Sequence, residues 1–185
     1  MNGLAHCVEA LYPERPNPVA RLMAEAGLRA LATGIPGSVA RPDDMAARTQ
    51  ALYGAFLGGG VIGLVGIAIH HKACHVLGGR HGLAHGESNA VVLPHAVAYN
   101  ADAAPEAMAT IRRALGADDA AGAVYDLARA LGAPASLQEL GMAEADLDEA
   151  ARLTVAATNW NPRKVDFASV RQMLDDAYFG RRPAA

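Results

Sequence analysis

The chain has 185 residues, a formal net charge of −3 and a hydrophobic fraction of 52%. That length can bury one sizeable core without disulfides, and the charge gives no basis for binding nucleic acid or an anionic membrane. Cys7 and Cys74 are too few for a disulfide scaffold and indicate buried thiols in a reducing cytosol. We therefore expect one cytoplasmic domain over residues 1–185, with small polar molecules as partners.

Apolar residues recur at helical spacing along most of the chain, whereas the alternation of a half-buried strand is nearly absent. The first helix has one apolar stripe and should end at the prolines of YPERPNP. That stripe consists of Leu4, Cys7, Val8 and Leu11. The segment lacks the basic start and the cleavage site of a signal peptide. A second helix should begin at Pro18 and end in a turn over 34–37, which reads Gly-Ile-Pro-Gly.

A third helix should open at 42–44 and run toward Ile69, with a bend at the glycines 58–60. The apolar run 55–69 is shorter than the ~20 residues that cross a bilayer, so it indicates a helix buried in protein. The segment GGGVIG, 58–63, fits the dinucleotide pattern G-x-G-x-x-G, but it lies in helical sequence rather than after a strand. We interpret these glycines as sites of close helix packing.

Five further helices are expected, separated by short turns. They span 86–99, 105–115, 119–131, 143–158 and 166–179. The run 91–93 could form a strand, but it is short and has no neighbouring strand to pair with. The predicted fold class is therefore all-α, a compact helical bundle.

Five of the seven histidines lie between residues 69 and 85. His71 and His75 are four apart, so on a helix they project from one face, and the glycines that follow let His85 return toward them. Three such imidazoles suit a tetrahedral or octahedral metal. The alternative is that each is a solvated or hydrogen-bonded residue, which is our interpretation of His70 and His81.

Asn2 and His6 are also four apart, on the first helix. An aspartate at position 2 would complete a divalent-metal site with His6, His71 and His85. The amide of Asn2 is a weak neutral ligand, so metal affinity should be low. Either of two nearby acids could substitute for the missing carboxylate, namely Glu9 and Glu87. His95 lies further along, and for it we expect a structural hydrogen bond.

Three segments carry a family resemblance: NGLAHCVEALY, HHKACHVLGGRHGLAHGESNAVVLPHAVAYN and NPRKV. They resemble the C-terminal helical domain of the iron-containing alcohol dehydrogenase superfamily, a dehydroquinate synthase-like bundle, and most of all its maleylacetate reductase branch. In such proteins an N-terminal α/β nucleotide-binding domain comes first, and the active site lies between the domains. Nothing here resembles that half, so we expect it to be missing or supplied by a separate chain.

By motif position, the ligands of the metal-dependent branch fall on Asn2, His6, His71 and His85, and His75 matches a histidine beside the nicotinamide. An asparagine at position 2 is a feature shared with the maleylacetate reductase branch. This resemblance implies an enzyme that works without a bound metal. We therefore expect no metal; His6, His71 and His85 are the ligands if one is bound.

The resemblance implies reduction of the carbon–carbon double bond of maleylacetate, a dicarboxylate from aromatic-compound breakdown, to 3-oxoadipate by NADH or NADPH. Hydride addition leaves negative charge on oxygen, which an imidazolium or another proton donor can stabilise in place of a metal. We predict His75 and His85 as catalytic residues, with His75 also next to the cofactor. The pocket should further contain Asn2, His6, His71, Lys72 and Arg163. Arg80 is another cationic candidate.

Two alternatives remain open. One is an Fe- or Zn-dependent alcohol dehydrogenase domain, and the other is a non-catalytic helical binding module. Half of a two-domain site cannot hold a hydride donor in attack geometry, so we expect negligible reductase activity from the chain alone. The surface left exposed should be apolar and favour association, and we expect a homodimer.

Overall fold

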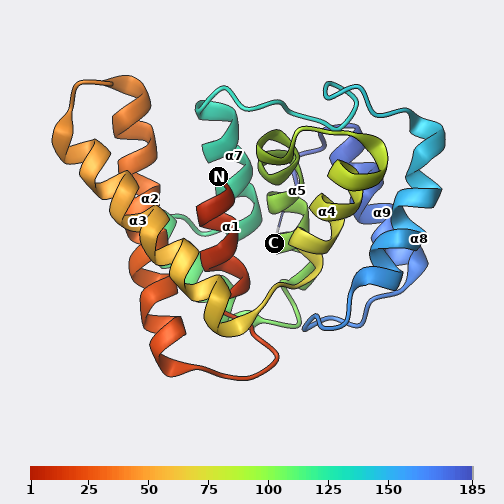
Figure 1. The fold of residues 1–185 in the computed structure, drawn as a ribbon, viewed down its shortest axis with the longest axis horizontal. Helices are drawn as coiled ribbons and strands as arrows, with labels where there is room; N and C mark the ends of the chain where they lie inside the picture. Colours follow the sequence, from red (N-terminus) through yellow and green to blue (C-terminus); the bar gives the residue numbers. More distant parts are fainter. Residues whose placement is uncertain (185) are drawn as a thin grey trace.

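A computed structural model describes residues 1–184 and contains, within them, nine α-helices, one 3₁₀ turn and no strand (Figure 1). The all-α architecture predicted from the periodicity is confirmed. The helices are α1 (Asn2–Glu9), α2 (Pro18–Ala40), α3 (Met45–Val65), α4 (Ile69–His81), α5 (His85–Asn100), α6 (Pro105–Leu115), α7 (Ala120–Ala130), α8 (Leu147–Ala157) and α9 (Phe167–Tyr178), and the 3₁₀ turn is η1 (Glu144–Asp146).

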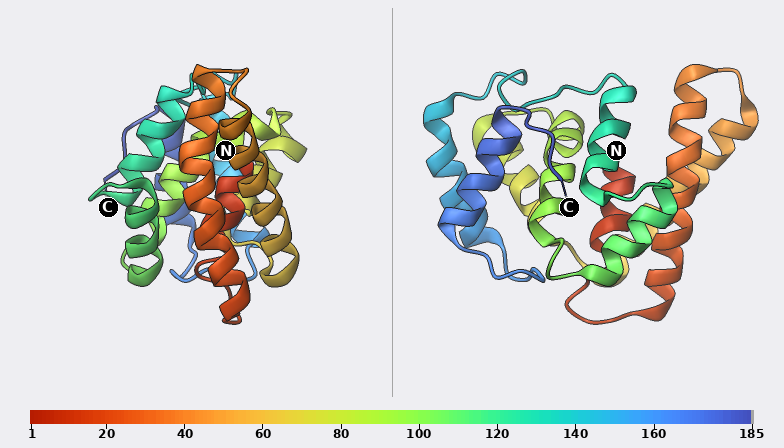
Figure 2. Two further views of the ribbon diagram at one scale, coloured as in Figure 1. Left: turned by 90° about the vertical axis from the view of Figure 1, so that its left-hand side faces the viewer. Right: turned by 180° about the vertical axis from the view of Figure 1, so that it is seen from behind.

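The helices α2 and α3 form a long antiparallel hairpin that projects from one side of the molecule (Figures 1 and 2). On the other side, α4, α5, α8 and α9 pack together, while α6 and α7 lie behind α5. The short helix α1 lies between the two sides and contacts α2, α3, α4 and α5. The N-terminal residues are therefore in the middle of the fold.

Two hydrophobic cores correspond to these two sides. The first gathers around α1, α2, α6 and α7, and the second around α4, α5, α8 and α9. The helix α5 is buried from Ser88 to Val97, as expected for a helix that is apolar on every side. Cys7 and Cys74 are both free and buried, which confirms their expected packing role, and burial raises the pKa of Cys7 to about 12.

The turn predicted over 34–37 is wrong, because α2 continues through it to Ala40 with Pro36 inside the helix. Close packing explains the glycine there. A Cβ added to Gly34 would lie 2.3 Å from the backbone nitrogen of Ala51 on α3. Only glycine lets the two helix backbones come this close. The glycine that suggested a turn is therefore explained by a contact between α2 and α3.

The bend predicted at 58–60 is also wrong. α3 runs through these glycines to Val65, and the break comes at Gly66, whose φ of 80° is the left-handed conformation that glycine adopts readily. There α3 and α4 meet at an angle of 99°. The change of direction delivers α4 to the centre of the molecule.

Close packing accounts for only part of the GGGVIG segment. A Cβ on Gly58 would lie 2.6 Å from the carbonyl oxygen of Gly3, so this glycine lets α1 approach α3. Added Cβ atoms on Gly59 and Gly63 would meet nothing within 4 Å. The packing interpretation is therefore confirmed at Gly58 and wrong at Gly59 and Gly63.

The later helices agree with the prediction. The helix predicted at 105–115 has those bounds, and the ends of the others lie within one or two residues, except that the segment 143–158 opens with η1 before α8. The run 91–93 lies inside α5 rather than in a strand. Among residues 1–184, only α3 and α4 taken together across their bend reach the length and hydropathy of a membrane span; no single helix does.

Candidate active site

Four histidines from three helices form a row of neighbouring rings. The ring of His6 on α1 stacks on that of His71 on α4, with centroids 4.7 Å apart. The rings of His71 and His75 lie 6.3 Å apart, and that of His75 stacks on His85 of α5 at 5.9 Å. The expected convergence of these imidazoles is therefore found.

Local structure explains this convergence. His71 and His75 are one turn apart on α4, which continues past its two glycines to His81. The helix ends at Gly82, whose φ of 69° is left-handed, while the Leu83 N–H donates to the Leu77 carbonyl. This tight reversal lets α5 begin at His85, within ring contact of His75.

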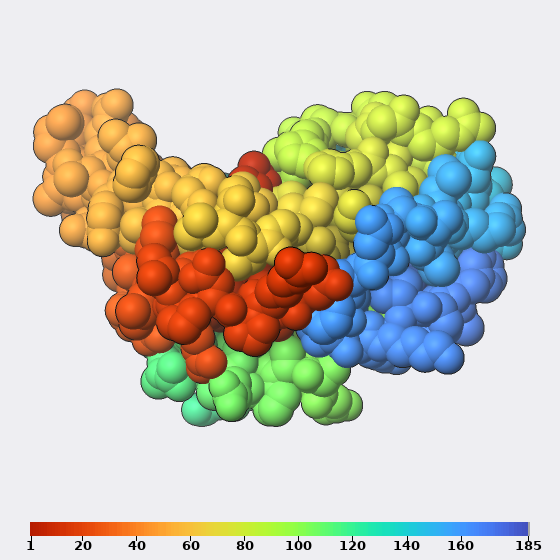
Figure 3. Space-filling view, turned by 60° about the horizontal axis from the view of Figure 1, so that its bottom comes forward, coloured from red at the N-terminus to blue at the C-terminus, as the bar shows by residue number. Residues whose placement is uncertain are grey.

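The exposure of the four rings differs along the row. His71 is buried, His6 is half-buried, and His75 and His85 are exposed. In the space-filling view the outline is notched between the tip of the α2–α3 hairpin and the α4–α5 region, and the first residues of the chain show at the floor of the notch (Figure 3). The exposed histidines are thus accessible to a second surface or a ligand.

Glu9 lies behind this row. Its side chain is fully buried, and its carboxylate Oε2 is 2.7 Å from Nδ1 of His71. The same carboxylate accepts hydrogen bonds from the backbone N–H groups of Ala68, at 3.0 Å, and His70, at 2.8 Å. The sequence suggested Glu9 only as a substitute metal ligand, whereas the structure makes it a hydrogen-bond partner of His71. The available signal was one acid within the apolar first helix.

Neighbouring polar groups complete the site. Oδ1 of Asn2 is 3.2 Å from Nε2 of His71. His70 is completely buried with its Nε2 3.2 Å from the carbonyl oxygen of Asn89, so its interpretation as a hydrogen-bonded histidine is confirmed. His81 lies away from the row, with Nδ1 3.7 Å from a carboxylate oxygen of Asp146.

The electrostatics favour neutral imidazoles at His6 and His75 and an ionised carboxylate at Glu9. Burial lowers the pKa of His6 and His75, and repulsion from His71 adds to both shifts. Burial by itself raises the pKa of Glu9, but the hydrogen bond with His71 and the other donors outweigh it, so the net pKa is lowered. Glu9 is therefore a carboxylate at neutral pH, and it supplies the negative charge of the site.

The predicted ligands His6, His71 and His85 do not fit a divalent ion in this arrangement. An imidazole binds metal in its ring plane at about 2.1 Å, and the planes of His6 and His71, 24° apart and stacked, do not meet at that distance. Within residues 1–184, two groups of donor atoms lie within 4.8 Å of one another: Glu9, His70 and His71, and His81, Asp146 and Glu149. The set His6, His71 and His85 is not one of them, and Glu87 is exposed on α5.

Of the three cationic side chains predicted for the pocket, only Lys72 lies next to the row of histidines. Lys72 adjoins the row on α4, where its charge contributes to the lowered pKa of His75. Arg80 pairs instead with Glu149 at 3.0 Å. The remaining candidate, Arg163, is far from the row of His6, His71, His75 and His85.

Arg163 stacks over the ring of Tyr99, 4.3 Å from its centroid. Tyr99 lies fourteen residues after His85 on α5, which is about 21 Å along the helix axis. The expectation that Arg163 lines the histidine pocket is therefore wrong. It was proposed from its charge alone, and the loop before α9 directs it to the other end of α5.

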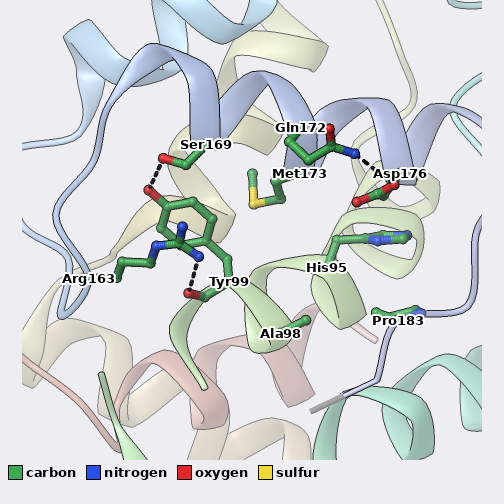
Figure 4. A pocket seen from close by; sticks show the side chains of 9 residues that line it. All are labelled: His95, Ala98, Tyr99, Arg163, Ser169, Gln172, Met173, Asp176 and Pro183. Atoms are coloured by element: carbon green, nitrogen blue, oxygen red, sulfur yellow. Dashed lines mark hydrogen bonds between the residues drawn. The ribbon is translucent and has the colours of Figure 1, made fainter. Parts of the chain in front are cut away.

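Arg163 instead lines a cavity of about 220 Å³ between α5 and α9, together with His95, Met173 and Asp176 (Figure 4). Nε2 of His95 is buried with no hydrogen-bond partner among the described residues, so the hydrogen bond expected for this side chain is missing at that nitrogen. Burial lowers the pKa of His95 to about 4. This cavity and four others along residues 1–184 are lined by residues other than His6, His71, His75 and His85.

Comparison with known proteins gives a consistent result. Residues 1–178 match the model of the Fe-containing alcohol dehydrogenase family, C-terminal. A maleylacetate reductase of Pseudomonas sp. strain P51 is 48% identical over 183 residues, which are 99% of this chain and 52% of that protein.

Solved structures are equally similar. A putative alcohol dehydrogenase from Ralstonia eutropha JMP134 superposes with a TM-score of 0.96 at 53% identity, covering 98% of this chain and 52% of that one. Maleylacetate reductase from Rhizobium sp. strain MTP-10005 gives 0.94 at 46% identity, with 98% and 52% covered. The chain therefore spans about half the length of the relatives that it matches.

Proposed function

The chain belongs to the Fe-containing alcohol dehydrogenase family, and on that basis we propose that it forms the C-terminal, helical half of an NADH- or NADPH-dependent maleylacetate reductase. The observation that supports this assignment most is the row of His6, His71, His75 and His85. The maleylacetate reductases of Pseudomonas sp. strain P51 and Pseudomonas aeruginosa are 48% and 45% identical over nearly the whole chain.

The proposed chemistry needs a proton donor and hydrogen bonds rather than a Lewis acid. Hydride addition to a double bond conjugated with a carbonyl group places negative charge on that oxygen, and the α-carbon then takes a proton. We assign these tasks to His75 and His85, which are exposed and stacked on each other. Lys72 supplies positive charge for a dicarboxylate, and Asn2, His6 and His71 form the inner wall.

The rest of the active site is assigned to the part of the relatives that this chain does not cover. A nucleotide-binding half, on the same polypeptide or a separate one, would hold most of NADH or NADPH and close the open face of the row. His75 then faces the nicotinamide. Asn2 contributes no charge and the ring planes do not converge on a point, so we propose that the reaction proceeds without metal. We also propose that the whole enzyme is a cytoplasmic homodimer.

The test is a two-domain protein, made by joining residues 1–185 to the nucleotide-binding half of the Rhizobium maleylacetate reductase. We expect it to oxidise NADH in the presence of maleylacetate, and the 185-residue chain alone to show no measurable turnover. His75→Gln or His85→Gln should reduce kcat/KM at least about 100-fold, as is typical for loss of a general acid. His81→Gln, on the same helix but outside the row, is the matched control and should retain turnover.

Two results would contradict the proposal. Undiminished turnover in both His75→Gln and His85→Gln would remove the catalytic assignment. About one iron or zinc atom per chain after mild purification, together with alcohol oxidation that a chelator abolishes, would favour a metal-dependent alcohol dehydrogenase. Circular dichroism of each variant would exclude a loss of folding as the cause.

A further inference from the structure

The helix α4 begins without a cap of its own. Its N-cap residue is Ala68, which has no side-chain acceptor, so the first N–H groups of the helix need partners from elsewhere. Glu9 of α1 provides them, with Oε2 accepting from Ala68 N–H and Oε1 from His70 N–H. The positive end of the α4 dipole favours a carboxylate at this position.

The same carboxylate determines where His71 carries its proton. Oε2 is 2.7 Å from Nδ1 of His71, and an ionised carboxylate can only accept a hydrogen bond. Nδ1 must therefore be the protonated nitrogen. A bare Nδ1 would place its lone pair against the carboxylate oxygen in a buried environment, which is strongly unfavourable.

His70 imposes the same choice independently. Its Nε2 lies 3.2 Å from the carbonyl oxygen of Asn89, which only accepts, so Nε2 carries the His70 proton. His70 is completely buried, and an imidazole that carries its proton on Nε2 presents Nδ1 as an acceptor. That Nδ1 lies 3.2 Å from Nδ1 of His71. Two acceptors, from α1 and from α4 itself, thus surround one nitrogen of His71.

We propose that Glu9 and His70 are positioning residues that hold the proton of His71 on Nδ1 and so direct Nε2 toward Asn2 and the open face. Neither touches the substrate. Nε2 of His71 lies 3.2 Å from Oδ1 of Asn2. With the His71 proton on Nδ1 both of these atoms would be acceptors, so the proposal also requires the Asn2 amide to make a half-turn and donate from its NH₂ group to Nε2. The inference rests on the proposed function only for its catalytic consequence, because the proton position can be measured in the chain itself.

The first experiment is two-bond ¹H–¹⁵N correlation NMR of the imidazole rings in the ¹⁵N-labelled 185-residue chain at pH 7. His71 is assigned by the signals that disappear in His71→Gln. We expect the ¹⁵N shift of a protonated nitrogen at Nδ1. An Nδ1 without a proton, with the proton on Nε2 alone, would overturn the proposal, and this result requires no variant of Glu9 to fold.

The second experiment uses Glu9→Gln. A glutamine cannot accept at both oxygen positions, and its NH₂ group turned toward His71 would donate to Nδ1 and move the proton to Nε2. We expect that tautomer switch in the NMR spectrum, whereas Glu87→Gln, an exposed acid on α5, should leave the His71 signals unchanged. An unchanged His71 spectrum in folded Glu9→Gln would count against the proposal.

The two-domain protein separates this inference from the proposed function. There, Glu9→Gln should lower kcat at least tenfold with KM changed less than about threefold, because substrate contacts remain while the reacting nitrogen is altered. If Nδ1 is protonated but the two-domain protein fails to reduce maleylacetate, only the functional assignment falls. If it is active while Nδ1 is bare, only the role of Glu9 and His70 falls.

Discussion

Burial keeps His70 and His95 neutral in the folded chain, with pKa values lowered to about 3 and about 4 from an ordinary value of 6.5. In the unfolded chain both regain that ordinary value. Between pH 6.5 and the folded-state values, the unfolded state therefore binds more protons, and stability falls as the pH falls. Glu9 acts in a lower window, because its folded pKa is below 4.5 and its stabilisation is lost as the pH falls from about 4.5 through that folded value.

We therefore predict constant stability above about pH 7 and a loss that steepens toward about 1.4 kcal/mol per pH unit for each buried histidine below pH 6. Urea unfolding between pH 7.5 and 5 measures it. His95→Leu should reduce the slope by about one proton, and it should fold because Nε2 has no partner to lose. A flat profile, or the wild-type slope in His95→Leu, would refute this account.

The sequence predicted the residues of the site where local geometry decides their position. His71 and His75 are brought together by the α-helical repeat, and His85 by a glycine turn, so spacing was sufficient. Glu9 was not predicted as the partner of His71, because that contact joins residues 62 apart in the chain. The position of Arg163 was predicted wrongly for a related reason. Its charge indicates that it could bind an anionic ligand, but it does not indicate at which end of α5 the loop before α9 places the side chain.

The α2–α3 pair shows how helices can be mistaken for turns. Glycine and proline at 34–37 are turn signals in isolation, and only the backbone of α3 beside Gly34 explains them. The helices α6, α7, α8 and α9 were predicted well because each has a plain apolar stripe. Two of them also have an N-cap aspartate whose side chain accepts a backbone hydrogen bond, such as Asp119, which accepts from Gly122 N–H at the start of α7. The periodicity of apolar residues is enough to predict an amphipathic helix. A close contact between two helix backbones also depends on a second helix, and the sequence around the glycine does not show which helix that is.

Two glycines in this hairpin should respond in opposite ways to alanine. Gly34→Ala forces a methyl group to within 2.3 Å of the Ala51 nitrogen and should destabilise the fold by about 1–3 kcal/mol or more. Gly59→Ala meets nothing within 4 Å inside helical backbone and should stabilise it by about 0.5–1 kcal/mol. Thermal and urea unfolding measure both. The same sign for the two substitutions would show that the packing argument is mistaken.

Across the whole molecule, the hairpin leaves apolar side chains on the surface. Leu52 and Phe56, one turn apart on α3, are 73% and 72% exposed, and Leu22 on α2 is 71% exposed. Exposed apolar groups on neighbouring helices favour association. This surface is where we expect contact with a second copy or with the nucleotide-binding half.

We predict that the purified 185-residue chain sediments as a dimer or larger species, and that Phe56→Lys shifts it toward monomer. Phe167→Lys, at a 41% exposed phenylalanine on α9, is the control and should leave the sedimentation coefficient unchanged. A monomeric wild-type chain at micromolar concentration would disprove this expectation.

The central position of α1 has one more consequence. The exposed residues 14–16 are an accessible site for a protease, and a cut there would leave a short N-terminal peptide held in place only by noncovalent contacts with its four neighbouring helices. That peptide carries Asn2, His6 and Glu9. Nicked protein should therefore stay assembled in buffer and lose its inner wall in denaturant, so the site could be reconstituted, or chemically edited, by adding a synthetic peptide to the remaining fragment.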